Sequence, residues 1–111
     1  MEIDRDSTEY LYIGVSGDIP SVSAEVAFVT PPARPGVGDW DPAVIVNNSG
    51  HPLWTDAVAS GVTGSFYVAI LVGSFGTGGV ELVSGDYQAW LRLTDTVEQP
   101  VRVAPAAVEV L

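Results

Sequence analysis

The sequence predicts an all-β fold, an antiparallel sandwich of about seven strands that forms a single domain over residues 1–111. Apolar and polar residues alternate over several short stretches, whereas helical periodicity is almost absent. Clusters of Gly, Pro, Asp and Asn separate these stretches at short intervals. No helical stretch is long enough to act as a crossover between parallel strands, and 111 residues suffice for one hydrophobic core.

The first half of the chain contains three predicted strands. Residues 9–16 and 21–29 carry apolar side chains at alternate positions, and Pro31-Pro32 ends the second stretch. Residues 33–42 are rich in Pro, Gly and Asp and predict a loop. The loop leads into a short apolar third strand at 43–46.

The middle of the chain is less regular. Residues 53–60 fit either a short helical turn or a meandering loop. Residues 65–72 are apolar on both faces and predict a strand that is covered from both sides. A brief strand is expected at 80–83.

The last part of the chain predicts two longer strands. Residues 86–94 alternate with the greatest regularity, and residues 101–111 are also apolar and alternating. Pro105 lacks a backbone N–H, so we expect the final strand to lie at a sheet edge. Because one face of each strand must be buried, the predicted core contains Tyr87, Ala89, Leu91 and Leu93 together with Val22, Val26 and Phe28.

A short motif narrows the type of sandwich. In Leu82-Val-Ser-Gly85-Asp-Tyr87, a Gly-x-Tyr sequence follows one predicted strand and opens the next. This resembles the tyrosine corner of Greek-key sandwiches, in which the phenol bonds back to nearby backbone. The expected architecture is therefore immunoglobulin-like.

The charge of the chain limits the class of partner. Four basic residues stand against 14 acidic ones, for a net charge of −10, and all four are arginines, located at Arg5, Arg34, Arg92 and Arg102. These are too few and too scattered to form a basic stripe, so the sequence argues against nucleic-acid binding. The negative field instead favours docking on a positively charged protein surface.

Cysteine usage and hydropathy exclude further classes. With no cysteine, the chain has neither disulfides nor thiolate metal sites. Residues 1–6 are acidic and polar, unlike a signal peptide. The longest strongly apolar run, at 66–72, is far shorter than the roughly 20 residues of a membrane-spanning helix. We therefore expect a soluble protein without a membrane partner.

The sequence offers little material for catalysis, cofactors or metals. The single histidine, His51, lies in a predicted turn, where a solvated side chain is the common case. The pairs Asp39 with Asp41 and Asp4 with Asp6 do not continue into calcium-loop spacing. The glycines between 73 and 79 lack the Lys-Ser/Thr of a phosphate loop. We expect no enzyme, no cofactor and no metal site.

Aromatic residues are the remaining candidates for a binding surface. Trp40, Trp54, Tyr10 and Tyr12 either form a platform on which sugars stack, or belong to the core or to a subunit contact. Core or subunit contact is the favoured interpretation, because interfaces are enriched in Trp and Tyr generally. A carbohydrate-binding or adhesion module is the alternative function.

Several segments together resemble a known group of proteins. They are Leu71-Val-Gly73, Val80-Glu-Leu82, Gly85-Asp-Tyr87-Gln-Ala-Trp90-Leu-Arg92-Leu-Thr-Asp95 and Glu98-Gln-Pro-Val-Arg102. In this order they are similar to small immunoglobulin-like virion-associated proteins of tailed bacteriophages that infect actinobacteria. The resemblance implies a non-enzymatic capsid decoration, head–tail connector or neck protein, located in the virion after assembly in the host cytoplasm. The implied partners are the major capsid, portal or connector protein and further copies of the chain in a symmetric assembly.

The candidate partner contacts are Trp90, Arg92, Trp54 and Trp40. Alternation puts Trp90 on the strand face opposite Tyr87, where an exposed ring is a plausible contact anchor. Two alternatives keep Trp90 within the subunit: the loop at 33–41 folds over it, or Arg92 packs against its ring.

Overall fold

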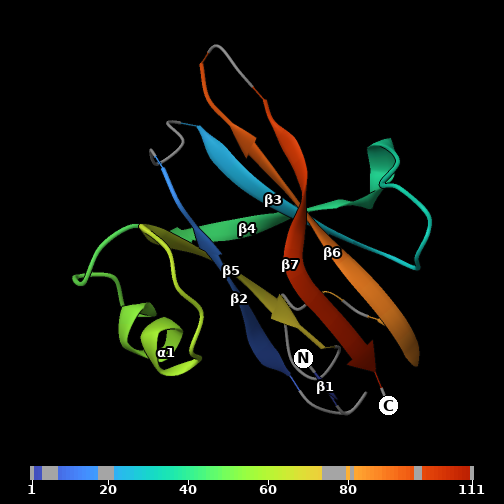
Figure 1. Cartoon of the computed structure of the whole chain (residues 1–111), viewed down its shortest axis with the longest axis horizontal. Coiled ribbons are helices and arrows are strands. Elements are labelled where there is room, and N and C mark those ends of the chain that lie inside the picture. Colours follow the sequence, from blue (N-terminus) through green and yellow to red (C-terminus); the bar gives the residue numbers. More distant parts are fainter. Residues whose placement is uncertain are drawn as a thin grey trace.

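The computed structural model describes residues 2–3, 8–17, 22–73, 80, 82–96 and 99–110. Within them it contains seven strands, one short α-helix and one 3-10 turn (Figure 1). In chain order these are β1 (Glu2–Ile3), β2 (Glu9–Val15), β3 (Ser23–Val29), η1 (Val37–Asp39), β4 (Trp40–Val46), α1 (Trp54–Ala59), β5 (Phe66–Val72), β6 (Gly85–Thr94) and β7 (Val101–Val110). The all-β prediction is confirmed, and 53–60 forms the helical turn.

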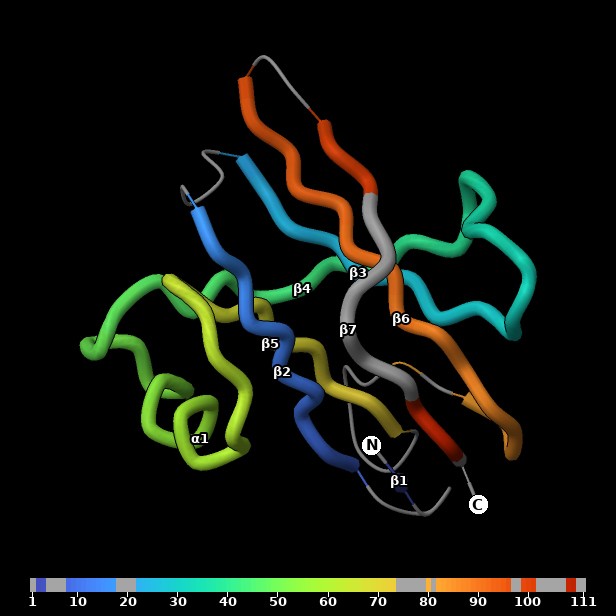
Figure 2. The backbone as a smooth tube through the Cα atoms, in the orientation of Figure 1, coloured from blue at the N-terminus to red at the C-terminus, as the bar shows by residue number. Residues whose placement is uncertain are grey.

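The strands form one mixed sheet in the order β1-β7-β6-β3-β4-β5-β2. All neighbours are antiparallel except β1, which runs parallel to β7. Strand β4 belongs to both halves, because Trp40 to Ala43 pair with β3 whereas Val44 to Val46 pair with β5. The sheet curls until β2 contacts β7 (Figure 2). The prediction of a sandwich is therefore corrected to a nearly closed, barrel-like sheet.

The main core fills the inside of this curled sheet. Six strands supply its buried side chains, which are Ile3, Leu11, Ile13, Val15, Ala24, Val26, Phe66, Val68, Ile70, Val72, Ala89, Leu91, Leu93 and Val108. Tyr87 and Phe28 are partly buried and pack against this cluster. The predicted inner faces of β3 and β6 are thus largely confirmed, and period-two alternation accounts for them.

Val22 is the exception among the predicted core residues. It precedes β3, and 58% of its surface is exposed. The alternation of the sequence continues to this position, but the strand does not begin until Ser23. The prediction that Val22 lies in the core is therefore wrong.

A second apolar cluster lies on the outer face of β2 and β5, under α1. It contains the buried residues Tyr12, Val46, Ala57, Tyr67 and Ala69, with Leu53, Trp54 and Val62 at its margin. Strand β5 is therefore covered on both faces, as its unbroken apolar sequence predicts.

The predicted final strand and the predicted strand at 80–83 differ in part from expectation. Strand β7 pairs with β1 only at Glu109 and Val110, so the described sheet leaves most of its outer side open. Pro105 lies where the β6–β7 register shifts, between the pairs Trp90↔Val103 and Gln88↔Ala107. At the predicted strand 80–83, the described residues form only an isolated bridge from Val80 to Val72.

The tyrosine corner is confirmed. The Tyr87 hydroxyl donates a 2.8 Å hydrogen bond to the Val83 carbonyl oxygen. Gly85 opens β6 with φ +150°, a conformation that residues with a side chain rarely adopt. Glycine and tyrosine at this spacing therefore let the chain turn sharply into the strand.

Candidate functional site

The outer face of β3, β4 and β6 carries three of the four predicted contact residues. Cross-strand register places Trp90 of β6 and Trp40 of β4 on either side of Ala27 in β3. Trp90, Ala27 and Val29 form a buried cluster, and Trp40 packs against it partly exposed. Arg92 lies beside the same cluster because it follows Trp90 by two residues on β6.

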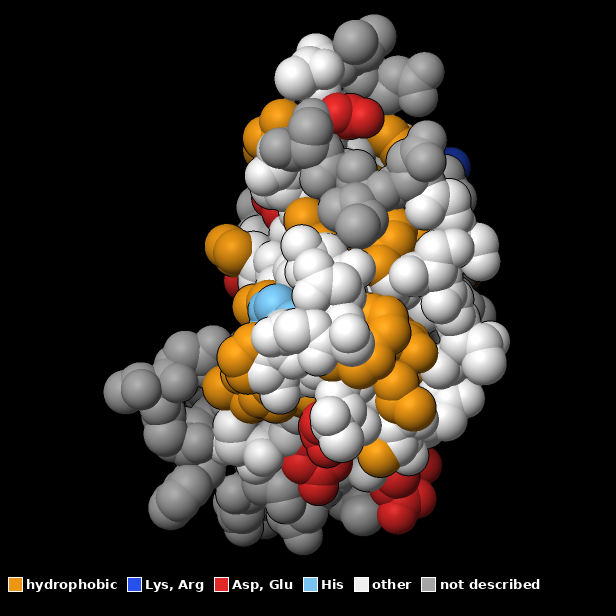
Figure 3. All heavy atoms as spheres, turned by 90° about the vertical axis from the view of Figure 1, so that its left-hand side faces the viewer, with side chains coloured by type: hydrophobic (Ala, Val, Ile, Leu, Met, Phe, Trp, Pro, Cys, Tyr) orange, Lys and Arg blue, Asp and Glu red, His pale blue; other side chains and the backbone are white. Residues whose placement is uncertain are grey.

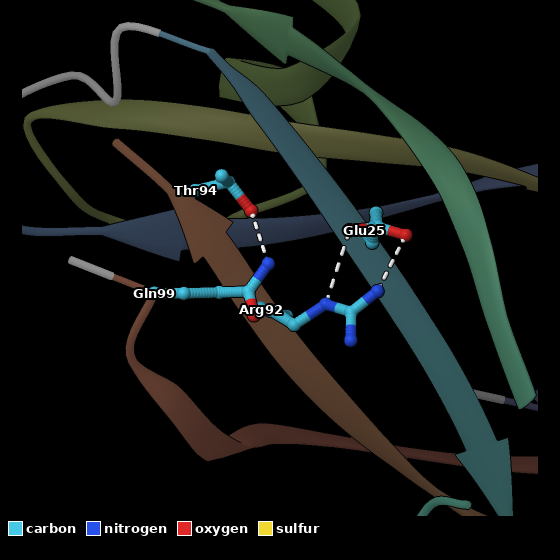
Figure 4. Close-up of polar contacts among 4 residues, drawn as sticks. All are labelled: Glu25, Arg92, Thr94 and Gln99. Atoms are coloured by element: carbon cyan, nitrogen blue, oxygen red, sulfur yellow. Dashed lines mark hydrogen bonds and ion pairs between the residues drawn. The ribbon is translucent and has the colours of Figure 1, made fainter. Parts of the chain in front are cut away.

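Arg92 joins an ion pair to an aromatic stack. Its Nε and one terminal nitrogen donate to the two carboxylate oxygens of Glu25, at 3.0 and 2.8 Å (Figure 4). Its guanidinium carbon lies 4.6 Å from the centre of the Trp40 ring. The two ion-paired side chains are 22% and 24% exposed, so solvent screens the pair only in part. Arg92 is thereby fixed in orientation on the sheet surface.

Trp90 points away from the inner face, as alternation predicts, but its ring is covered within the subunit. Only 9% of its surface is exposed. The guanidinium carbon of Arg34 lies 5.2 Å from the ring centre, so the loop at 33–41 folds over Trp90 as one of the two covering alternatives proposed. Arg92 stacks on Trp40 instead. The expectation of an exposed Trp90 is corrected accordingly.

The indole nitrogen of Trp90 is buried and lacks a hydrogen-bond partner among the described residues. Arg34 differs from Trp90 in being exposed, and it has no ion-pair partner in the described part of the chain. We call Arg34, Trp40, Trp90 and Arg92 the arginine–tryptophan face. Its cationic groups lie on aromatic rings, in a protein that has few cations elsewhere.

Trp54, the fourth predicted contact residue, does not belong to this face. It is the first residue of α1 and meets Tyr67 edge-on, with ring centres 5.1 Å apart and planes at 70°. The proposed sugar platform is divided in the same way. Trp40 lies on the arginine–tryptophan face, whereas Trp54 and Tyr12 pack in the cluster under α1.

A separate feature lies between β2 and α1. An open hollow of about 400 Å³ is lined by Glu9, Tyr10, Tyr12, Asp56, Ala59 and Ser60. Figure 3 shows the side of the molecule that carries α1, with hydrophobic side chains across its middle and carboxylates gathered toward its lower part. We call the hollow lined by these six residues the β2–α1 hollow.

One hydrogen bond organises the β2–α1 hollow. The Tyr12 hydroxyl donates to Asp56 Oδ2 at 2.5 Å. Burial of Tyr12 raises the pKa of its phenol well above the ordinary value, and the adjacent Asp56 raises it further. The phenol therefore stays protonated and remains a donor. This pair could not be predicted from the sequence, because Tyr12 lies on a strand and Asp56 on a helix, and alternation does not show how the two elements pack together.

The remaining predicted candidates have local structural roles. His51 Nδ1 accepts the Leu53 N–H at 3.1 Å, within the turn before α1. Asp39 Oδ2 accepts the Gly36 N–H at 2.7 Å and closes η1. Burial raises the pKa of Asp41, and the neighbouring Asp39 carboxylate contributes to the same shift. Each of these side chains is explained by its own turn or strand.

Metal and membrane features are limited to what the described residues contain. They hold no group of three or more His, Cys, Asp or Glu side chains placed to bind a metal ion. No helix in the described part of the chain is long and apolar enough to cross a membrane. Asp4 and Asp6, and the glycine-rich segment from 74 to 79, lie outside the described residues.

Comparison with known proteins adds no relative: the chain matches no family model, no curated protein and no solved structure.

Proposed function

We propose that this chain is a non-enzymatic structural protein of a tailed-phage particle, which docks on the capsid or head–tail neck through protein–protein contacts. The observation that carries the proposal is the arginine–tryptophan face. Trp and Arg are enriched among the residues that dominate the energetics of protein interfaces, and here strands β4 and β6 hold Trp40, Trp90 and Arg92 on one face of the sheet. Arg34 brings an exposed positive charge without an intramolecular carboxylate partner among the described residues, so it suits an acidic group on a neighbouring subunit.

The finer fold assignment that we propose is immunoglobulin-like. Its support is the connectivity: β2-β5-β4 corresponds to the B-E-D order of one immunoglobulin sheet, and β3-β6-β7 to the C-F-G order of the other. The tyrosine corner then lies at the start of the F-like strand, its expected place. The difference is that β4 also pairs with β3 and joins the two sheets.

Assembly tests the proposal directly. The gene is deleted from the phage genome and replaced by the wild-type gene or by a variant, and phage particles are then purified. The amount of the chain in these particles is measured by mass spectrometry. We expect the wild-type chain to be present, and the variants Arg34→Ala and Trp40→Ala to be folded but depleted. Val83→Ser, which alters a 75% exposed residue outside the face, is the matched control and should be retained. Absence of the wild-type chain from purified particles would overturn the proposal.

A carbohydrate-binding or adhesion module is the second candidate. The observation in its favour is the pair Tyr10 and Tyr12, whose ring centres are 6.0 Å apart beside the β2–α1 hollow. However, Tyr12 is only 5% exposed, which leaves Tyr10 as the accessible ring of the pair. Gene order distinguishes the candidates, because neighbouring portal, capsid or tail-completion genes favour the first and fusion to hydrolases or cell-wall anchors favours the second.

A further inference from the structure

The charged side chains that line the β2–α1 hollow all carry negative charge. Two carboxylates, from Glu9 and Asp56, and two phenol rings, from Tyr10 and Tyr12, contribute to it. None of the described residues that line the hollow is Lys or Arg. The electrostatic potential in the hollow is therefore negative, and the net charge of −10 reinforces it.

The hydroxyl groups of the lining are largely occupied within the chain. Tyr12 donates its proton to Asp56 Oδ2, and Ser60 donates its proton to the carbonyl oxygen of Ala57 at 2.5 Å. What remains for a ligand is mostly acceptors: the second oxygen of Asp56 and the carboxylate of Glu9. A ligand that fits must therefore mainly donate hydrogen bonds rather than accept them.

The aromatic rings add a second requirement. Tyr10 is 38% exposed, and its ring lies at 30° to that of Tyr12, with 6.0 Å between the ring centres. An exposed phenol face beside carboxylates attracts a cation, because the ring quadrupole and the negative charges act in the same direction. A planar guanidinium satisfies both features, since it stacks on a ring and donates to a carboxylate with its edge.

We propose that the β2–α1 hollow binds an arginine side chain presented by a partner protein. Tyr10 provides the stacking surface, and Tyr12 holds Asp56 in position to accept from the guanidinium. Arg34 and Arg92 are both stacked on tryptophans of the arginine–tryptophan face, so neither occupies the hollow. This inference goes beyond the proposed function, because it concerns a different surface and holds whether or not the chain belongs to a virion.

The test is an NMR titration of the isotope-labelled chain with the peptide acetyl-Gly-Arg-Gly-amide. We expect shifts of the Tyr10, Asp56 and Ser60 amide signals, and none with the same peptide carrying citrulline, the neutral isostere of arginine. Asp56→Asn and Tyr10→Ala should each weaken binding by about fivefold or more. Because Asn retains a side-chain oxygen that can accept from Tyr12, the first variant is expected to stay folded.

Asp86→Asn is the matched control, because it makes the same change in net charge at an exposed position at the start of β6, away from α1 in Figure 1. It should bind the arginine peptide as the wild type does. Equal weakening by Asp86→Asn and Asp56→Asn would overturn the proposal, since the attraction would then be a general effect of net charge. Equal binding of the citrulline peptide would overturn it too, as would shifts of the same signals with methyl glycosides but not with the arginine peptide.

Discussion

The hydroxyl of Tyr87 is bonded to the carbonyl oxygen of Val83, four residues earlier, and the bond closes the corner that leads into β6. Since β6 is the strand between β7 and β3, a loose corner would affect two strand pairs at once. The hydrogen bond of the corner is local, but it supports a strand on which two strand pairs of the sheet depend.

Replacing Tyr87 by Phe removes this hydrogen bond and keeps the ring. We expect the free energy of unfolding to fall by about 1 kcal/mol, the usual net value of one hydrogen bond. Urea denaturation followed by tryptophan fluorescence measures it. Tyr10→Phe removes a hydroxyl for which the described structure shows no hydrogen bond, and it should leave the midpoint unchanged. A loss of equal size in both variants would contradict the role assigned to the corner.

The Arg92–Glu25 pair should depend on geometry as well as on charge. Arg92→Lys keeps the positive charge but loses the two parallel hydrogen bonds and the flat stack on Trp40. We expect a loss of about 1 kcal/mol of stability. Glu25→Gln should cost a similar amount, and the double variant should lose clearly less than the sum of the single losses. Strict additivity in this double-mutant cycle would show that the two side chains do not act together.

Gly14 is required by a close approach of two backbone segments. A Cβ atom at this position would lie 2.0 Å from the carbonyl oxygen of Thr63, which no side-chain rearrangement can relieve. Gly14→Ala should therefore destabilise the fold by about 3 kcal/mol, at the upper end of overpacking effects. In Gly38→Ala the new methyl group meets nothing within 4 Å, and its thermal midpoint should stay close to that of the wild type.

The raised pKa of Asp41 predicts a pH-dependent effect on stability. Because the folded state retains the proton more strongly than the unfolded state, the contribution of Asp41 is most favourable below the unfolded pKa of about 3.9 and is lost as pH rises through the folded pKa. Asp41→Asn should consequently raise the thermal midpoint at pH 7, and the gain should disappear toward pH 3. Asp86→Asn, with the same change in net charge, is the reference against which the gain is measured.

Alternation predicted the local structure well where a strand has one buried face. In β6 it assigned Ala89, Leu91 and Leu93 to the core and Trp90 to the other face, as observed. It failed to predict the start of β4, because Asp41-Pro42 has the composition of a loop. At Pro42 the strand pairs only with β3, at Glu25, so a residue without an N–H is tolerated there.

The surroundings of the candidate contacts depend on pairings that a single strand does not encode. Arg92 meets Glu25 through the β3–β6 register, and Arg34 reaches Trp90 through the path of a loop. Neither arrangement can be predicted without the tertiary structure. The same holds for the distinction between a sandwich and a curled sheet. Both produce period-two sequences, and here the difference lies in the pairing of β4 with both β3 and β5 and in the contact of β2 with β7.

The parallel pairing of β1 with β7 has a consequence for how the chain folds. Glu2 lies opposite Glu109, and the β2–β5 pair also joins segments that are far apart in sequence. Such non-local contacts require large loops to close before any pairing energy is gained, which slows folding relative to helical proteins of the same size. During synthesis on the ribosome, β1 has no strand to pair with until β7 has emerged. The pairing that holds the strand of the buried Ile3 in the sheet therefore forms late, and the nascent chain must remain unaggregated until then.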